Sequence, residues 1–228
     1  MPRQTLTKDQ VVTAAIALLD ESGLDGLNMR ALGKRLDSAA TAVYWHVENK
    51  DNLVRLAADE IFTEIELPDP GALGWRQAAA RLARGLFAML NRHPWLAQAM
   101  GSHLLYGPGQ SRFDDHSITV YEHAGFTGTD ADRAAATVHI YVLGNMLGTA
   151  ANVTLTRKLS NSGVDPEAAM SRTMAKAVEV GSRFPRLRTR LESTAAADYF
   201  AAPEGSFEFG LATILDGLGN RLTARQAA

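Results

Sequence analysis

Residues 28–50 read NMRALGKRLDSAATAVYWHVENK, and a helix, a sharp turn and a second short helix follow one another within them. Asn28 is placed to cap a helix that runs to about Leu36. After the turn, Ser38 is placed to cap a second helix that runs to about His46. Two short helices with a tight join are typical of a helix-turn-helix that enters the major groove of DNA, although a small orthogonal bundle of helices has the same pattern.

Longer helices flank this segment on both sides. Thr7 and Gln10 have the spacing of a capping box, and the helix that they begin ends near Gly23. Asn49 is placed to cap a fourth helix that runs to about Glu66 with an apolar stripe along one side. Small residues fill the start of the second short helix, which suits a helix that enters a groove about 12 Å wide.

Everything after residues 67–71 is predicted to form a larger helical domain. The segment Leu67-Pro68-Asp69-Pro70-Gly71 ends the fourth helix, because it holds two prolines and a glycine. Beyond it, apolar periodicity predicts helices at about 74–92, 94–101, 110–124, 130–156, 166–183, 185–194 and 206–224. Strand patterns are absent. The sequence therefore predicts an all-α protein of about nine to ten helices, with a three-helix helix-turn-helix domain over 1–50, a connecting helix over 51–66 and a larger domain over 67–228.

The composition excludes several classes of function. Of the 228 residues, 23 are Lys or Arg and 25 are Asp or Glu, so the net charge of −2 excludes a polycation that binds nucleic acid by bulk charge. The absence of cysteine excludes disulfides, thiolate zinc sites and thiol nucleophiles. It also fits a reducing cytoplasm, which is the expected location. The N-terminal residues lack the apolar stretch of a secretion signal.

One segment has the length of a membrane span but is expected to stay out of lipid. Residues 134–156 hold no Asp, Glu, Lys or Arg over 23 positions. They do hold threonines, asparagines and a histidine, which lipid solvates poorly. The sequence therefore predicts a buried helix here and no membrane partner.

The sequence resembles one family of regulators along nearly its whole length. Residues 27–32, LNMRAL, and residues 41–53, TAVYWHVENKDNL, closely resemble the DNA-binding domain of the tetracycline-repressor (TetR) family of bacterial transcriptional regulators. The Tyr-Trp-His-Val-x-Asn-Lys string is a specific signature. Residues 93–96, HPWL, and residues 207–218 look like the ligand-binding and dimerisation domain of the tetracycline-repressor branch. The resemblance implies a homodimer that binds a double-stranded DNA operator and whose residues 67–228 bind a small-molecule effector.

The resemblance also implies DNA contacts within the helix-turn-helix segment. Arg30 is implied to reach a base edge, and the small residues of the second helix are implied to face bases, where methyl groups contact the thymine methyl. Lys50 is implied to hold a phosphate, at a helix N-terminus that favours an anion. For Trp45, a contact with sugar–phosphate and a wedge against the fourth helix are both open, and Tyr44 and His46 fit a phosphate contact or a structural role. The full set is Arg30, Ala40, Thr41, Ala42, Tyr44, Trp45, His46 and Lys50.

The same resemblance implies a dimer interface made by two helices of the larger domain. Their equivalents in the family form a four-helix bundle with a second copy across a two-fold axis. Gly144 and Gly148 would permit close approach there, although they would also relieve crowding within one chain. Leu211, Leu215 and Leu218 belong to an apolar stripe of the last helix that would complete the interface. A homodimer in turn predicts a palindromic operator.

Methionine, aromatic and histidine side chains of the larger domain indicate a small-molecule pocket. Such side chains line adaptable apolar cavities, although each is also an ordinary core residue. The residues assigned to the pocket are Leu86, Met89, Met100, His103, Phe113, His116, His139 and Met146. The spacings HxxxH and HxH are absent, so no metal ligand is assigned. Aligned on Trp75 and His93, Leu82 and Met100 stand where tetracycline repressors hold the drug and its magnesium through Asn and His, so a more apolar effector is expected.

Together these observations predict a ligand-responsive DNA-binding regulator, a repressor that a small and largely apolar effector releases from its operator. An activator bound to DNA is equally compatible with the physics. The alternatives are an α-helical enzyme that works in the cavity of the larger domain and an architectural DNA binder without an effector. The sequence has no Gly-x-Ser-x-Gly elbow, P-loop, Gly-x-Gly-x-x-Gly helix start or His-Glu-x-x-His motif, so no catalytic residue, cofactor or metal is assigned.

Overall fold

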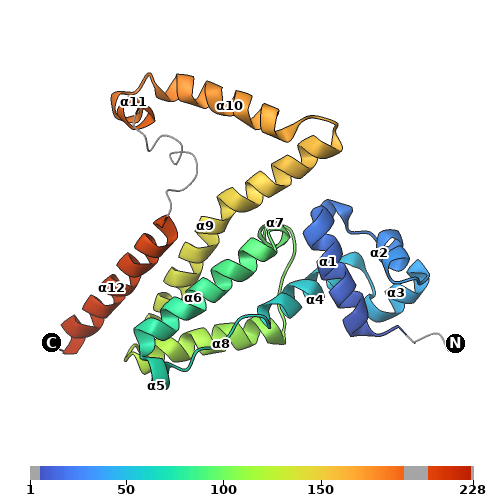
Figure 1. The fold of residues 1–228 in the computed structure, drawn as a ribbon. Coiled ribbons are helices and arrows are strands. Elements are labelled where there is room, and N and C mark those ends of the chain that lie inside the picture. The colour runs from blue at the N-terminus through green and yellow to red at the C-terminus, as the bar shows by residue number, and fades with distance from the viewer. Residues whose placement is uncertain (1–5, 193–204, 227–228) are drawn as a thin grey trace.

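The computed structural model describes residues 6–192 and 205–226, and every regular element in these ranges is a helix (Figure 1). In chain order the helices are α1 (Lys8–Gly26), α2 (Met29–Arg35), α3 (Ala40–Val47), α4 (Lys50–Phe62), α5 (Pro70–Leu73), α6 (Trp75–Arg92), α7 (Trp95–Met100), α8 (Pro108–His123), α9 (Thr129–Asn161), α10 (Pro166–Gly181), α11 (Pro185–Leu191) and α12 (Ser206–Gln226). The all-α class predicted from the sequence is confirmed. The described helices outnumber the nine to ten expected, in part because the short α5 begins inside the proline-rich segment.

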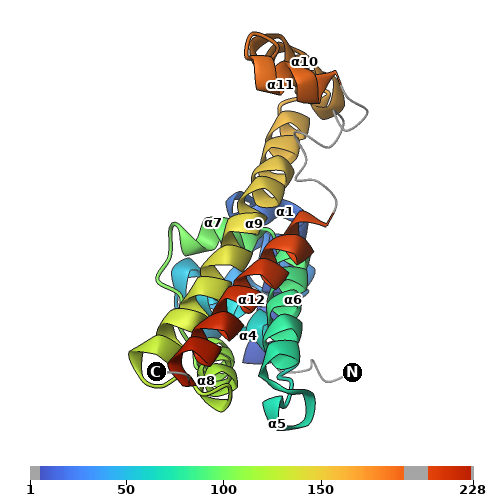
Figure 2. The same cartoon turned by 90° about the vertical axis from the view of Figure 1, so that its left-hand side faces the viewer.

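The helices form a small unit, a larger body and a projecting arm (Figures 1 and 2). The small unit consists of α1, α2 and α3, and α4 connects it to the body by packing on α1, α6 and α8. In the body, α6 packs on α8, α9 and α12. The arm is the last part of α9 together with α10 and α11, and it leaves the body because the buried positions of α9 end at Ala150. Neither α10 nor α11 contains a buried residue.

Three of the predicted helix starts are confirmed by their side-chain caps. Thr7 and Gln10 form the full capping box of α1, in which the amide of Gln10 donates to the Thr7 hydroxyl oxygen at 3.2 Å. The side chain of Asn28 accepts from the amide of Ala31 at 2.8 Å at the start of α2. Asn49 accepts from the amide of residue 52 at 2.7 Å and begins α4 in the same way.

The cap predicted for α3 is wrong. Ala39 rather than Ser38 is the N-cap residue, and no side chain caps this helix. The amide of Ser38 donates to the carbonyl oxygen of Gly33 at 2.9 Å, so Ser38 belongs to the turn after α2. That turn lies directly on α2, because a Cβ atom at Gly33 would lie 2.8 Å from the Ser38 carbonyl oxygen.

Helix α4 is shorter than its apolar pattern indicates. It ends at Phe62, not near Glu66, and Thr63 is its C-cap. The Thr63 hydroxyl donates to the carbonyl oxygen of Glu60 at 2.7 Å, and the guanidinium of Arg112 donates to the carbonyl oxygen of Ile65 at 3.3 Å. These bonds satisfy carbonyl groups at the helix end and hold the chain in a turn.

A continuous hydrophobic core runs from the small unit into the body. Leu32 and Val43 are fully buried in the small unit, Leu53 is fully buried in α4, and Leu86 and Met89 are buried in the body. Within the described ranges, no helix combines the length and the apolar character that a membrane crossing requires. The segment 134–156 lies inside α9, where one face is buried against the body.

Candidate functional site

Helix α3 has one buried face and one exposed face. Val43 and Val47 are fully buried, and they fix the side of the helix that points into the small unit. Thr41 is exposed, while Ala40 and Ala42 are half-buried. The small residues therefore lie at the surface rather than beneath other helices, as a helix that enters a DNA groove requires.

The aromatic side chains of α3 also point outward. The exposed fraction is 89% for Trp45 and 48% for Tyr44, and His46 is half-buried. A wedge between α3 and α4 would bury the indole, so the exposure of Trp45 excludes that alternative. Trp45 and His46 instead line a wide groove of about 1450 Å³ between α1 and α3.

The cations of the small unit differ in how strongly they are held. Arg30 is exposed at the start of α2 and has no ion pair with any residue that the structure describes. The guanidinium of Arg35, by contrast, donates two hydrogen bonds to Glu21, at 2.7 and 2.8 Å. These hydrogen bonds lower the pKa of the Glu21 carboxyl. Arg30 is therefore the cation more readily available to a base or phosphate.

Lys50 stands in the first turn of α4 and is exposed. Its ammonium group donates to the carbonyl oxygen of Leu24 at 2.9 Å, which ties α4 to the end of α1. The helix N-terminus beside it favours an anion, and an exposed ammonium can exchange a carbonyl partner for a phosphate oxygen. The position is therefore compatible with the phosphate contact that the resemblance implies.

The eight residues assigned to an effector pocket do not gather in one cavity. Leu86, Met89, Phe113 and Met146 lie in the hydrophobic core, and Met100 packs against it. His103 and His116 contact different segments of the chain. The Nε2 of His103 is 3.4 Å from Asp51 in the first turn of α4, and the Nε2 of His116 donates to the carbonyl oxygen of Pro68 at 2.9 Å, beyond the helix end.

His139 is the assigned residue that borders an open groove. The groove measures about 350 Å³ and lies between α8 and α9, where Gln110, Asp114 and Ser117 also line it. Burial lowers the pKa of His139, while the negative charge of Asp114 acts in the opposite direction. Burial likewise raises the pKa of Asp114. The groove thus offers a ligand a neutral imidazole, a carboxyl group and an amide beside apolar side chains.

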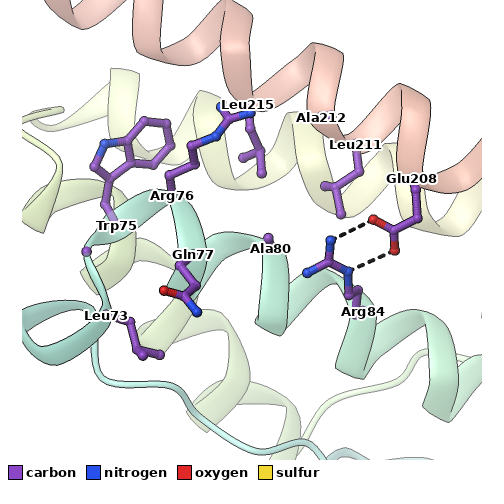
Figure 3. A pocket seen from close by; sticks show the side chains of 11 residues that line it. Leu73, Trp75, Arg76, Gln77, Ala80, Arg84, Glu208, Leu211, Ala212 and Leu215 are labelled. Atoms are coloured by element: carbon purple, nitrogen blue, oxygen red, sulfur yellow. Dashed lines mark hydrogen bonds and ion pairs between the residues drawn. The ribbon is translucent and has the colours of Figure 1, made fainter.

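A second groove, which the sequence analysis missed, lies between α6 and α12 (Figure 3). It measures about 370 Å³, and Trp75, Ala80, Leu211 and Leu215 are among its apolar residues. Two ion pairs border it: Arg84 with Glu208, at 2.6 Å, and Arg76 with Asp216, at 2.7 Å. Sequence patterns carry no signal for this groove, because its walls are more than a hundred residues apart in the chain.

The residues assigned to a dimer interface divide into two groups. Gly144 and Gly148 are exposed on α9, and a Cβ atom at either position would meet nothing within 4 Å. Leu211, Leu215 and Leu218 are buried within the chain itself, because α12 turns its apolar stripe toward α6 and α9. In this respect the structure differs from the expectation, because the two glycines lie at the surface of the chain and the three leucines do not.

Comparison with known proteins relates both the N-terminal and the C-terminal part of the chain to the same family of regulators. The family model for bacterial regulatory proteins of the tetR family matches residues 11–57, and the model for the tetracyclin repressor-like C-terminal domain matches residues 67–222. An HTH-type transcriptional regulator of Saccharopolyspora erythraea is 37% identical over 141 residues, which are 62% of this chain and 60% of that protein, less than two thirds of its length. The tetracycline repressor protein class A of Escherichia coli is 32% identical over 224 residues, which are 95% of this chain and 92% of that protein.

A solved structure also resembles the whole chain. It is that of the TetR family protein ActR of Streptomyces coelicolor in complex with actinorhodin. The TM-score is 0.74 at 25% sequence identity, over 95% of this chain and 96% of that one.

Among the described residues, no group of three His, Asp or Glu side chains is placed to hold a metal ion.

Proposed function

This chain belongs to the tetracycline-repressor family of bacterial regulatory proteins, and on that premise we propose that it is a homodimeric repressor. The two copies of α3 read a palindromic operator, and a small apolar effector releases the protein from it. A repressor acts where the DNA is, so we place it in the cytoplasm. The observation that carries the proposal is the outward face of α3, where small residues and a highly exposed Trp45 remain free of other protein.

The DNA contacts follow from the exposed side chains of the small unit. The free guanidinium of Arg30 suits a bidentate contact with guanine, and the Thr41 methyl group suits contact with a thymine methyl. Trp45 has an open indole face that packs on sugar, while Tyr44, His46 and Lys50 reach phosphates. Ala40 and Ala42 allow α3 to lie close to the base edges.

The second copy covers the exposed apolar face of α9. Ile140 and Leu147 are 67% and 64% exposed, and they lie on the same side of α9 as Gly144 and Gly148. Side chains of this kind are normally buried, and glycines beside them let two helices approach closely. A two-fold axis through this face gives two copies of α3 in equivalent positions, which engage half-sites about 34–36 Å apart.

The effector is expected to be an apolar, aromatic molecule rather than a tetracycline–magnesium complex. Leu82 is buried in the core and Met100 packs against it, so neither position offers an oxygen or nitrogen to a drug or metal. ActR, which resembles this chain in fold, is known in complex with actinorhodin. The groove beside His139 offers a few polar groups among apolar ones, which is the usual character of such sites.

Release needs only a difference in effector affinity between two arrangements of the dimer. If the effector binds better to the arrangement with the wrong half-site spacing, it lowers the affinity for the operator. By linkage, the operator lowers the affinity for the effector by the same factor. Coupling of this kind amounts to about 1–3 kcal/mol in allosteric proteins.

The decisive experiment measures binding to the DNA fragment upstream of the protein's own gene, over a series of salt concentrations. Arg30→Ala is expected to lose sequence preference, whereas Arg84→Ala, which removes a cation from the body, retains it. Equal preference in the Arg30 variant and the wild type would contradict the base contact. Absence of any preference in the wild type would contradict the proposed function.

The chemical class of the effector is tested by measuring how much of the upstream DNA fragment each candidate ligand releases from the protein. Actinorhodin, the aromatic ligand in the ActR complex, is expected to release more DNA than tetracycline with Mg²⁺ at equal concentration. Tight binding of tetracycline–Mg²⁺ with release of the DNA would contradict an apolar effector.

A further inference from the structure

Asp20, near the end of α1, receives contacts from several parts of the body. The indole N–H of Trp95 donates to its Oδ1 at 2.8 Å, and the Nδ1 of His93 donates to the same oxygen at 2.7 Å. The guanidinium of Arg157 donates to the main-chain carbonyl oxygen of Asp20 at 3.2 Å. One residue of the small unit is therefore held by the end of α6, by α7 and by α9.

These contacts are shielded from water, which makes them stronger than surface contacts of the same kind. Trp95 and His93 are buried, with exposed fractions of 3% and 6%. The side chain of Asp20 is itself only 32% exposed. Because two donors share one carboxylate oxygen, a displacement of α7 or of the end of α6 changes the position of Asp20 directly.

The imidazole of His93 extends the network to the end of α4. Its Nε2 is 3.1 Å from the Oε1 of Glu64, and Arg92 also binds that carboxylate. Both ring nitrogens face carboxylate oxygens, so both donate only when the ring is protonated. Burial would raise the pKa of Glu64, but hydrogen bonds and charges from Arg92 and His93 outweigh it and lower the pKa.

Arg157 reaches α1 because the backbone there is open. Gly23, three residues after Asp20, has a φ of 66° and a ψ of −174°, which breaks the regular helix. A Cβ atom at this position would lie 2.2 Å from a nitrogen of the Arg157 guanidinium. The glycine thus both bends the end of α1 and makes room for a side chain from α9.

We propose that Asp20 is a positioning residue that sets the orientation of the DNA-binding unit relative to the effector-binding body. The chain connects the two through α4 alone, and a single connecting helix leaves rotation about its own axis to be fixed by other contacts. Asp20 supplies a second attachment point, remote from the surface of α3 that meets DNA. This inference rests on the proposed function, because orientation matters only if two copies of α3 must match two half-sites.

The experiment compares the orientation in three variants of the full chain. Because the chain has no cysteine, Lys34→Cys in α2 and Asp115→Cys in α8 place one spin label on each side of the junction. Diluting the labelled chains with unlabelled protein restricts the measured distance to one chain. Asp20→Ala removes the acceptor oxygens, whereas Asp20→Asn keeps one oxygen that accepts from Trp95 and His93.

The matched control is Glu21→Ala, which removes the neighbouring carboxylate. Glu21 binds Arg35 inside the small unit and does not cross the junction. We expect a broad distance distribution for Asp20→Ala, and narrow distributions for Asp20→Asn, for Glu21→Ala and for the wild type. If Asp20→Ala fails to fold, Trp95→Phe removes one donor only and should broaden the distribution to a smaller extent.

Operator binding supplies the second readout. Asp20→Ala should bind the upstream DNA fragment about tenfold more weakly, with unchanged affinity for unrelated DNA. A distribution as narrow as that of the wild type in both Asp20→Ala and Trp95→Phe would overturn the proposal, as would equal broadening in Glu21→Ala. If the wild type shows no preference for the upstream fragment, the proposed function fails, but the distances still report whether Asp20 sets the orientation.

Discussion

The imidazole of His139 in α9 stands edge-on to the ring of Phe113 in α8, with 5.9 Å between the ring centroids and 63° between the planes. The contact joins two long helices of the body beside an open groove. It also removes the imidazole from water, which explains why its pKa is lowered by burial.

Stability is expected to fall as the pH drops below about 6.5, the ordinary pKa of histidine. In that range the unfolded chain binds a proton at His139 that the folded chain does not, so protonation favours unfolding. His139→Gln should remove this part of the pH dependence in urea unfolding between about pH 5 and 8. An identical slope in the wild type and the variant would contradict the burial of a neutral imidazole.

Trp45→Ala is expected to weaken operator binding by about tenfold, or about 1.4 kcal/mol, without changing the melting temperature. The indole is 89% exposed, so the folded protein loses no packing with it. Val43→Ala, on the buried side of the same helix, is the matched variant and should cost about 2 kcal/mol of stability. A loss of stability in Trp45→Ala comparable with that in Val43→Ala would place the indole in the core instead.

Gly144→Leu is expected to shift the protein toward monomer in sedimentation experiments. A Cβ atom at this position would meet nothing within 4 Å in the same chain, and leucine favours a helix more than glycine does. Dissociation would therefore point to a second copy that occupies the space above Gly144. Ser111→Leu, an equally exposed enlargement on α8, should leave the assembly intact. The proposed interface is wrong if both variants remain fully associated.

Gly23→Ala is expected to destabilise the protein by about 1–3 kcal/mol. The φ and ψ values at Gly23 belong to a region that residues with a side chain rarely adopt, and the new methyl group would displace Arg157. Gly101→Ala is the control, because Gly101 has ordinary helical angles and space for a methyl group. Chemical denaturation of both variants gives the difference, and similar midpoints would argue against a strained junction.

Local features of the fold could be predicted from the sequence because their partners lie within a few residues. The caps at Thr7, Asn28 and Asn49 each join a side chain to an amide three residues ahead. Ser38 has the same chemistry but another role, because the tight turn against Gly33 fixes its backbone. The end of α4 depends on Arg112, which lies almost fifty residues away, and no local pattern indicates it.

The candidate site could be predicted only as far as helix periodicity reaches. The buried and exposed faces of α3 follow from the spacing of Val43 and Val47. The stripe of α12 is equally regular, but periodicity does not say whether an apolar face meets its own chain or a copy. Leu211 and Leu215 meet their own chain. The groove between α6 and α12 depends on contacts such as that of Arg84 with Glu208, which are 124 positions apart in the sequence. Only the folded chain brings such residues together.

Helix α3 spans eight residues and begins without a side-chain cap. Helices shorter than about 12 residues do not persist in water by themselves. The helical form of α3 therefore depends on the hydrophobic contacts of its buried side chains, Val43 and Val47, with the rest of the protein. We therefore expect mild heating, or a substitution that loosens α1 or α4, to reduce the discrimination among DNA sequences before the larger body unfolds.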